Sequence, residues 1–123
     1  MSTIAKAIVM RGDKLLALQR PTGSAQGIWD LPGGGSYEDP NRELATDVLN
    51  QTGQHITVKN LAASIDLNLE STGNPAHRCD FYETENVFSD VRMSSDFTGY
   101  RWVSVEELKT LDPLDPFVAT YIH

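Results

Sequence analysis

Apolar and β-branched positions in the first 20 residues predict two β-strands. Residues 3–10 and 15–20 carry the side chains typical of strands. Between them, Gly12 and Asp13 form a pair that suits a tight turn. We therefore predict that the chain opens with a β-hairpin in which these two strands pair with each other.

A helical pattern follows a loop that is rich in glycine. Asp39 and Pro40 have the order of an N-cap and a first helical residue, and Gly53 suits the position just after a helix. The segment between them is predicted to be a helix of about 13 residues and about 20 Å. At about 100° per residue, one side of this helix is apolar and the other is polar. The apolar side holds Leu44, Ala45, Val48 and Leu49, and the polar side holds Glu43, Asp47, Asn50 and Gln51.

The middle of the chain is predicted to be mostly sheet. Residues 55–69, 78–87 and 100–103 carry the β-branched and aromatic side chains of strands, with a turn at residues 71–75.

Two short helices are predicted near the end of the chain. Ser104 and Glu107 have the spacing of a capping box, and Asp115-Pro116 repeats the signal of a cap followed by proline. The order of all these elements predicts one α+β domain over residues 1–123, built around a mixed β-sheet.

Charge and composition narrow the classes of partner. The formal net charge is −7, whereas attraction to a nucleic-acid backbone or an anionic membrane needs clustered Lys and Arg. Cys79 is the single cysteine, so no internal disulfide can form, and the apolar stretch at residues 1–10 is too short for a signal peptide or membrane span. These features predict a cytoplasmic protein without a nucleic-acid or membrane partner, and a polyanionic ligand would need a metal.

Residues 29–34, Trp-Asp-Leu-Pro-Gly-Gly, and the helix that ends at Thr52-Gly53 resemble the signature of the Nudix hydrolase family. In that signature a glycine is followed by five residues, Glu, seven residues, and then Arg-Glu-apolar-any-Glu-Glu-any-Gly. Residues 15–20 and 100–108 also resemble family features, so the resemblance covers nearly the whole chain. It implies a Nudix-like α/β/α sandwich that cleaves the diphosphate linkage of a nucleoside diphosphate joined to another moiety.

The signature has a chemical reason. Attack by water on an anionic diphosphate needs divalent cations, which neutralise charge and lower the pKa of water. Carboxylates three or four residues apart on a helix converge on one face, and a glycine-rich loop lets a backbone carbonyl approach the same ions. The resemblance therefore implies a Mg²⁺ or Mn²⁺ cofactor held by this helix and by the Gly34 carbonyl.

The helix departs from the family pattern at its acidic positions. Counted back from Gly53, the three late glutamate positions fall on Asp47, Asn50 and Gln51, while Glu38 matches the first glutamate. Asn and Gln offer a carbonyl oxygen but not the negative charge that favours Mg²⁺ binding. Two ligand charges are therefore missing in this register.

A second register, four residues earlier, matches Arg42-Glu43 to the Arg-Glu pair but breaks the spacing to Gly53. We favour the first register, because the length from helix cap to glycine is harder to shift than a loop. One helical turn separates the registers, so Glu43 and Asp47 are neighbours on the same face in both. They are the predicted catalytic carboxylates and metal ligands, with Glu38 as a further ligand.

Residues outside the acidic face complete the predicted site. Asp96 precedes Trp102 by six residues, where the resemblance implies a loop carboxylate that orients the attacking water. Arg20 is predicted to contact phosphate. Gly33, Asn50 and Gln51 are also predicted to bind the substrate.

The neutral residues on the helix favour an alternative function. A binding or regulatory module on the same fold would recognise a nucleotide or a related small ligand without cleaving it. In either case the expected partner is a small nucleotide-like molecule, and a homodimer is the assembly that the resemblance suggests.

Overall fold

The computed structural model describes residues 2–21, 27–67, 76–87 and 89–123. The turn predicted at residues 71–75 lies outside these ranges. The strands are β1 (Ser2–Ile8), β2 (Met10–Arg11), β3 (Lys14–Arg20), β4 (Ile28–Asp30), β5 (His55–Asp66), β6 (Ala76–Val87) and β7 (Gly99–Val103), and the helices are α1 (Pro40–Thr52), α2 (Val105–Leu108) and α3 (Pro116–Ile122).

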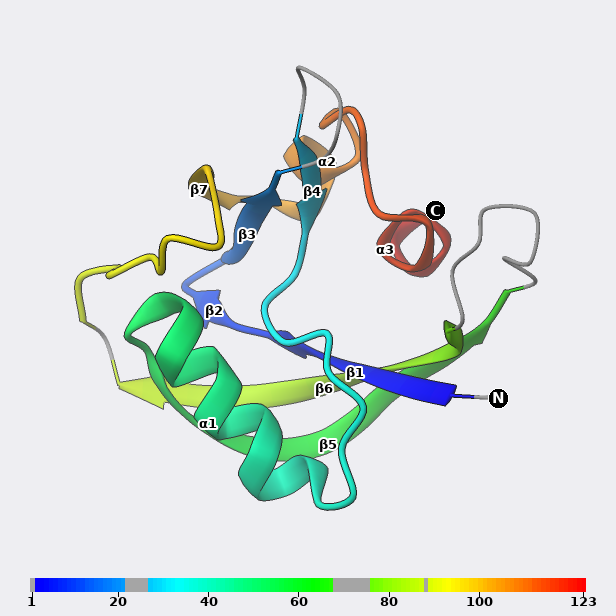
Figure 1. Cartoon of the computed structure of the whole chain (residues 1–123). Coiled ribbons are helices and arrows are strands. Elements are labelled where there is room, and N and C mark those ends of the chain that lie inside the picture. Colours follow the sequence, from blue (N-terminus) through cyan, green and yellow to red (C-terminus); the bar gives the residue numbers. More distant parts are fainter. Residues whose placement is uncertain (1, 22–26, 68–75, 88) are drawn as a thin grey trace.

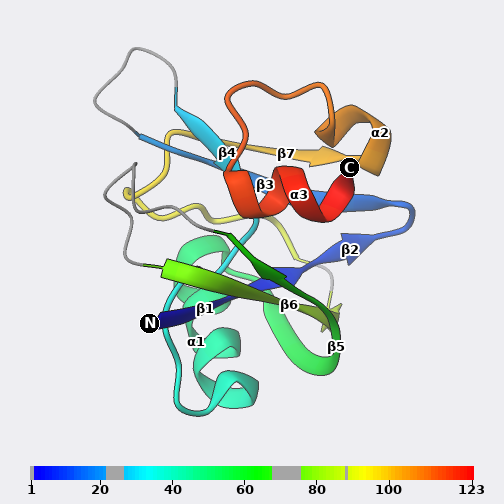
Figure 2. The ribbon, with the colours of Figure 1, turned by 90° about the vertical axis from the view of Figure 1, so that its right-hand side faces the viewer.

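The described strands form two sheets (Figure 1). The first sheet has the order β1-β6-β5, with β1 parallel and β5 antiparallel to β6. In the second sheet β3 pairs with β2, β4 and β7, all antiparallel. Figure 2 shows α1 on one side of the first sheet and α3 on the other, toward the second sheet. The predicted mixed sheet between helices is confirmed.

The predicted pairing of residues 3–10 with residues 15–20 is wrong for most of its length. The first strand divides at Val9: β1 pairs with β6, and only β2 pairs with β3. Val9 is fully buried, and its carbonyl accepts a hydrogen bond from Leu16 N at 2.9 Å. The chain therefore passes from the first sheet to the second at this residue. Alternation of apolar residues predicts a strand but does not specify its partner.

The predicted bounds of α1 are confirmed. Pro40 is its first residue, and Gly53 follows its end with φ +75°, a left-handed conformation that favours glycine. The Asp39 side chain makes no capping hydrogen bond. Instead, Glu43 reaches back, and its Oε2 accepts from Asp39 N at 3.0 Å.

The apolar side of α1 differs from the prediction at one end. Leu44 and Val48 are fully buried, whereas Leu49 is 37% exposed. Thr52, one turn beyond Val48, is fully buried in its place, and its hydroxyl donates to the Val48 carbonyl at 2.7 Å. The buried stripe therefore continues along the 44-48-52 row, since residues four apart lie above one another on a helix.

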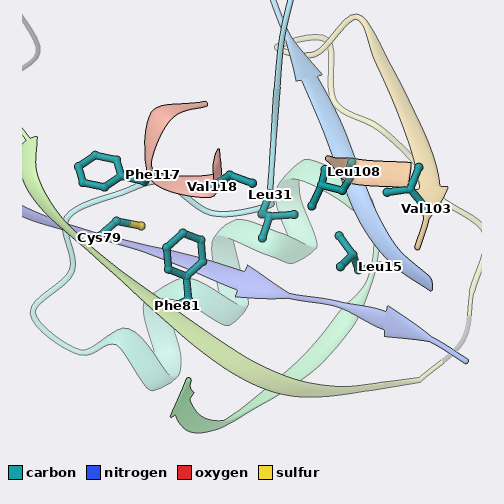
Figure 3. Close-up of a cluster of buried hydrophobic side chains, with 9 residues drawn as sticks. Leu15, Leu31, Cys79, Phe81, Val103, Leu108, Phe117 and Val118 are labelled. Carbon is teal, nitrogen blue, oxygen red and sulfur yellow. The ribbon is translucent and has the colours of Figure 1, made fainter. Parts of the chain in front are cut away.

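The core occupies both faces of the first sheet. On one face, Cys79 and Phe81 of β6 lie beside Phe117 and Val118 of α3 (Figure 3). On the other face, Leu44 and Val48 pack against buried residues of β1, of β3 and of the link after β1: Ala5, Ala7, Val9, Leu16 and Leu18. The sheet is thus buried on both sides, as a sandwich requires.

None of the helices in the described ranges is long and apolar enough to cross a membrane. The longest, α1, has 13 residues. At 1.5 Å per residue it spans about 20 Å, against the roughly 30 Å of a bilayer's hydrocarbon core.

Candidate active site

A glycine-rich loop carries the chain from β4 to α1 along the edge of β1. Gly34 N donates to the Ala5 carbonyl at 2.7 Å, and Ala5 N donates to the Gly35 carbonyl at 3.0 Å. Gly33 and Gly34 have φ angles of +102° and +101°, which side-chain-bearing residues rarely adopt. A Cβ on Gly33 would lie 2.6 Å from Leu44 Cδ1. The loop is therefore fixed between β1 and α1, and only glycine fits at residue 33.

Gln51 of α1 closes the junction between helix and loop. Its Oε1 accepts from Gly33 N at 2.8 Å, and its Nε2 donates to the Gly33 carbonyl at 3.0 Å. Both polar groups of this side chain are thus engaged by a single backbone residue. The predicted roles of Gln51 and Gly33 in substrate binding stay predictions, since their polar groups serve this junction.

Gln51→Leu is expected to lower the free energy of unfolding by about 1–3 kcal/mol, because it leaves the Gly33 N–H and carbonyl without partners. The loss should be the same in EDTA and in Mg²⁺, since the junction consists of the protein's own amides. Urea unfolding followed by circular dichroism measures it. Asn50→Leu, the corresponding change at the exposed neighbour, is the control. Equal losses in both variants would contradict the role given to Gln51.

Tyr37 links the loop to Asp47. Its hydroxyl donates to Asp47 Oδ2 at 2.5 Å and accepts from Gly35 N at 3.1 Å. Partial burial, and then the hydrogen bond to Asp47, raise the pKa of Tyr37 well above its usual range. The phenol is therefore neutral at physiological pH and remains a donor to the carboxylate.

Glu43 and Asp47 lie one helical turn apart and open onto one cleft of about 390 Å³. This volume falls within the roughly 300–1,000 Å³ typical of small-molecule sites. The cleft is lined by Tyr37, Arg42, Glu43, Thr46 and Asp47. Two carboxylates against one guanidinium leave it acidic, so a phosphate-bearing ligand would need a cation to enter.

The donor set fits a hard divalent cation that is shared with a ligand. Over the described ranges, no three His, Cys, Asp or Glu side chains gather into a group that could hold a metal by itself. Mg²⁺ commonly takes one or two carboxylates and completes its shell with waters and the phosphate oxygens of a substrate. Glu43 and Asp47 meet that requirement.

Other predicted residues lie outside the cleft lining. Glu38 and Asn50 are exposed on the loop and on α1. Asp96 is exposed on the segment before β7, where its backbone N–H donates to Ser94 Oγ at 3.3 Å. This segment runs past the end of α1, because Ser94 N donates to the Gln51 carbonyl at 3.0 Å. Asp96 therefore lies nearer the end of α1 than its beginning, and its role stays a prediction.

Comparison with known proteins identifies the fold. No family model matches the sequence, and neither does any curated protein. Solved structures do match: the MutT protein from Methanosarcina mazei Go1 superposes with a TM-score of 0.76 and 23% identity, covering 98% of this chain and 89% of that chain. A MutT Nudix hydrolase from Burkholderia pseudomallei superposes with a TM-score of 0.74 and 17% identity, covering 98% of this chain and 95% of that chain. The chain has the Nudix fold. An ADP-ribose pyrophosphatase from Streptococcus suis shares this fold. It superposes with a TM-score of 0.68 and 17% identity, covering 98% of this chain and 84% of that chain.

The Nudix fold here contains a charge cluster in which Lys6, Asp30 and Asp115 are buried and Arg20 is exposed. The Arg20 guanidinium lies 2.9 Å from Asp30 Oδ2 and 3.0 Å from Asp115 Oδ2. Lys6 Nζ lies 2.7 Å from Asp30 Oδ1 and 3.9 Å from Asp115 Oδ2. Burial, and then the charge of Asp30, raise the pKa of Asp115, and Lys6 opposes this rise. Arg20 is bound to this cluster, so its predicted phosphate contact stays a prediction.

Two features of this Nudix fold were not predicted as parts of the site or its support. Tyr37 is an aromatic residue in a loop, where no periodicity marks its partner. Lys6 is the one charged residue among the apolar positions of β1, and this isolation was the available signal that it is buried and paired. Arg42 entered the sequence prediction through the second register alone, with no role in the site, and in the structure it lines the cleft.

Proposed function

We propose that this protein is a divalent-cation-dependent hydrolase that cleaves the diphosphate linkage of a nucleoside diphosphate joined to another moiety. The observation that carries the proposal is the placement of Glu43 and Asp47 on one cleft beside the glycine-rich loop. The Nudix fold, shared with a structure described as an ADP-ribose pyrophosphatase, supports the substrate class.

The chain's own residues would divide the work. Glu43 and Asp47 hold the cation, which when bound supplies charge neutralisation and activation of water. Arg42 is exposed at the same cleft, and its guanidinium can donate to a phosphate oxygen. The Gly34 carbonyl and Glu38 are proposed as additional cation ligands, and Asp96 as the group that orients water.

The partner proposed for this site is a small nucleotide-like molecule. The chain's formal net charge of −7 does not attract a nucleic-acid backbone or an anionic membrane. Cytoplasmic location and a homodimeric assembly complete the proposal.

A phosphate-release screen tests the activity. Nucleoside triphosphates, nucleotide sugars, ADP-ribose and dinucleoside polyphosphates are incubated with the protein in Mg²⁺, Mn²⁺ or EDTA, and released phosphate is measured after coupling to pyrophosphatase and phosphatase. We expect turnover in Mg²⁺ or Mn²⁺ and none in EDTA. Asp47→Asn should lower turnover about 100-fold or more, since loss of a group that only supports a metal ligand already costs about 10- to 100-fold, while Asp13→Asn in the exposed β2–β3 turn should leave it unchanged. Absence of turnover with every substrate and metal would overturn the hydrolase proposal.

A second candidate function is a module that binds a nucleotide-like ligand without cleaving it. The engagement of Gln51 by Gly33 favours it, because one of the acidic positions of the signature is here a neutral side chain already hydrogen-bonded to the loop. Nucleotide affinity in EDTA discriminates the two functions. A module that binds through amides and arginine keeps its affinity without metal, whereas the hydrolase loses its hold on phosphate.

A further inference from the structure

The hydroxyl of Tyr37 makes two hydrogen bonds at the candidate site, one to an acceptor and one to a donor. It donates to the Asp47 carboxylate and accepts from the Gly35 N–H. A cation bound to a phosphate group needs the same kinds of partner: a carboxylate for the cation and an N–H donor for the phosphate oxygen. The tyrosine therefore occupies Asp47 Oδ2 and the Gly35 N–H at the same time.

Tyr37 has a fitted place in the loop. A Cβ on Gly35 would lie 2.6 Å from Tyr37 Cε1, 2.8 Å from Cζ and 2.9 Å from the hydroxyl oxygen. The ring thus lies directly against the Gly35 backbone, which the hydrogen bond from Ala5 N to the Gly35 carbonyl ties to β1. Absence of a side chain at residue 35 is what admits the ring.

We propose that Tyr37 is an internal competitor of the ligand at Asp47 Oδ2, so that its hydroxyl must leave this oxygen before both carboxylate oxygens of Asp47 can bind a divalent cation. This inference rests on the proposed function, because it takes Asp47 as a cation ligand. Hydrogen bonds to charged acceptors are among the stronger ones in proteins. The free energy needed to displace the Tyr37 hydroxyl therefore lowers the apparent affinity of the protein for the cation, because only the displaced conformation can bind it fully.

Mn²⁺ binding without any substrate tests the proposal. Free Mn²⁺ is counted by electron paramagnetic resonance during titration of wild type, Tyr37→Phe and Gly35→Ala. Tyr37→Phe keeps the ring and removes the hydroxyl, whereas Gly35→Ala keeps the hydroxyl and displaces the ring. We expect both to bind Mn²⁺ about 10-fold more tightly or better, the scale of a hydrogen bond to a charged group. Tyr100→Phe, at an exposed tyrosine of β7, should match wild type.

The outcomes separate this proposal from the proposed function. Equal Mn²⁺ affinity in wild type, Tyr37→Phe and Gly35→Ala would overturn the competitor role and leave the cation site intact. Mn²⁺ binding that Asp47→Asn does not weaken, or absence of binding to every variant, would overturn both. In wild type, addition of Mg²⁺ should also shift the Tyr37 ring signal in NMR spectra of ¹³C-tyrosine-labelled protein, and an unmoved signal at saturating Mg²⁺ would count against displacement.

Discussion

Replacing Lys6 by methionine is expected to lower the free energy of unfolding by about 3–5 kcal/mol at neutral pH, the usual effect of removing one partner of a buried ion pair. Lys6 is 2% exposed, and its ammonium lies 2.7 Å from Asp30 Oδ1. Methionine preserves much of the packing but not the charge. Among the described residues, Arg20 would then be the one cation in contact with both Asp30 and Asp115, and its side chain is 44% exposed.

The effect of this substitution should depend on pH. Lys6 lowers the pKa of Asp115, so its removal raises that pKa further. An acid whose pKa is raised in the folded state contributes stability that is full below its unfolded pKa and is lost as the pH rises through the folded pKa. The deficit of Lys6→Met is therefore smallest at acidic pH and grows as the pH rises through the raised pKa of Asp115.

Urea unfolding of Lys6→Met and wild type at several pH values measures the deficit. Lys14→Met is the matched control, because Lys14 is 48% exposed and lies 3.8 Å from the exposed Glu107. It should change stability little, as surface ion pairs contribute little. A deficit for Lys6→Met no larger than that of the control would show that the ion pair between Lys6 and Asp30 does not stabilise the fold.

Gly33→Ala is expected to lower the free energy of unfolding by about 2–5 kcal/mol, the combined scale of an overpacked contact and a strained backbone conformation. The new Cβ would lie 2.6 Å from Leu44 Cδ1 and 2.9 Å from the Ala5 carbonyl oxygen. Leu44 is fully buried, so its side chain has little room to move, and the Ala5 carbonyl belongs to the backbone of β1.

Gly34→Ala is a closely matched control for this prediction. Gly34 has nearly the same φ, +101°, but a Cβ there meets nothing within 4 Å. It therefore carries the backbone strain without the contact, and its loss should be about 1–3 kcal/mol. Thermal and urea unfolding of both variants gives the difference. Equal losses would mean that close approach to α1 does not restrict residue 33.

The elements predicted correctly are those with local signals. Pro40 and Gly53 bound α1 because a cap depends only on neighbouring residues, and the capping box at Ser104 is present for the same reason, with Glu107 N donating to Ser104 Oγ at 3.1 Å. The partner of β1 was mispredicted, because pairing depends on residues far along the chain. Hydrophobic alternation alone cannot distinguish β3 from β6 as that partner.

In the candidate site, too, the features with a local signal were predicted and those that depend on distant residues were not. Helical periodicity predicted that Glu43 and Asp47 share one face, and both line the cleft. It could not show that the Asp47 carboxylate already accepts a hydrogen bond, because Tyr37 reaches it from a loop without regular geometry. Likewise, the neutral side chain of Gln51 indicated a missing charge but not the amide pair with Gly33.

The pairing of β1 with β6 determines when the site can form during synthesis. Residue 2 pairs with residue 76 and residue 8 with residue 83, so β1 has no sheet partner until most of the chain has left the ribosome. The glycine-rich loop is hydrogen-bonded to β1, and α1 packs on the same strand. The loop and α1 are both synthesised before β6, yet the strand on which they pack joins its sheet only after β6 emerges. A nascent chain arrested before residue 76 should therefore carry the signature residues without a folded cleft.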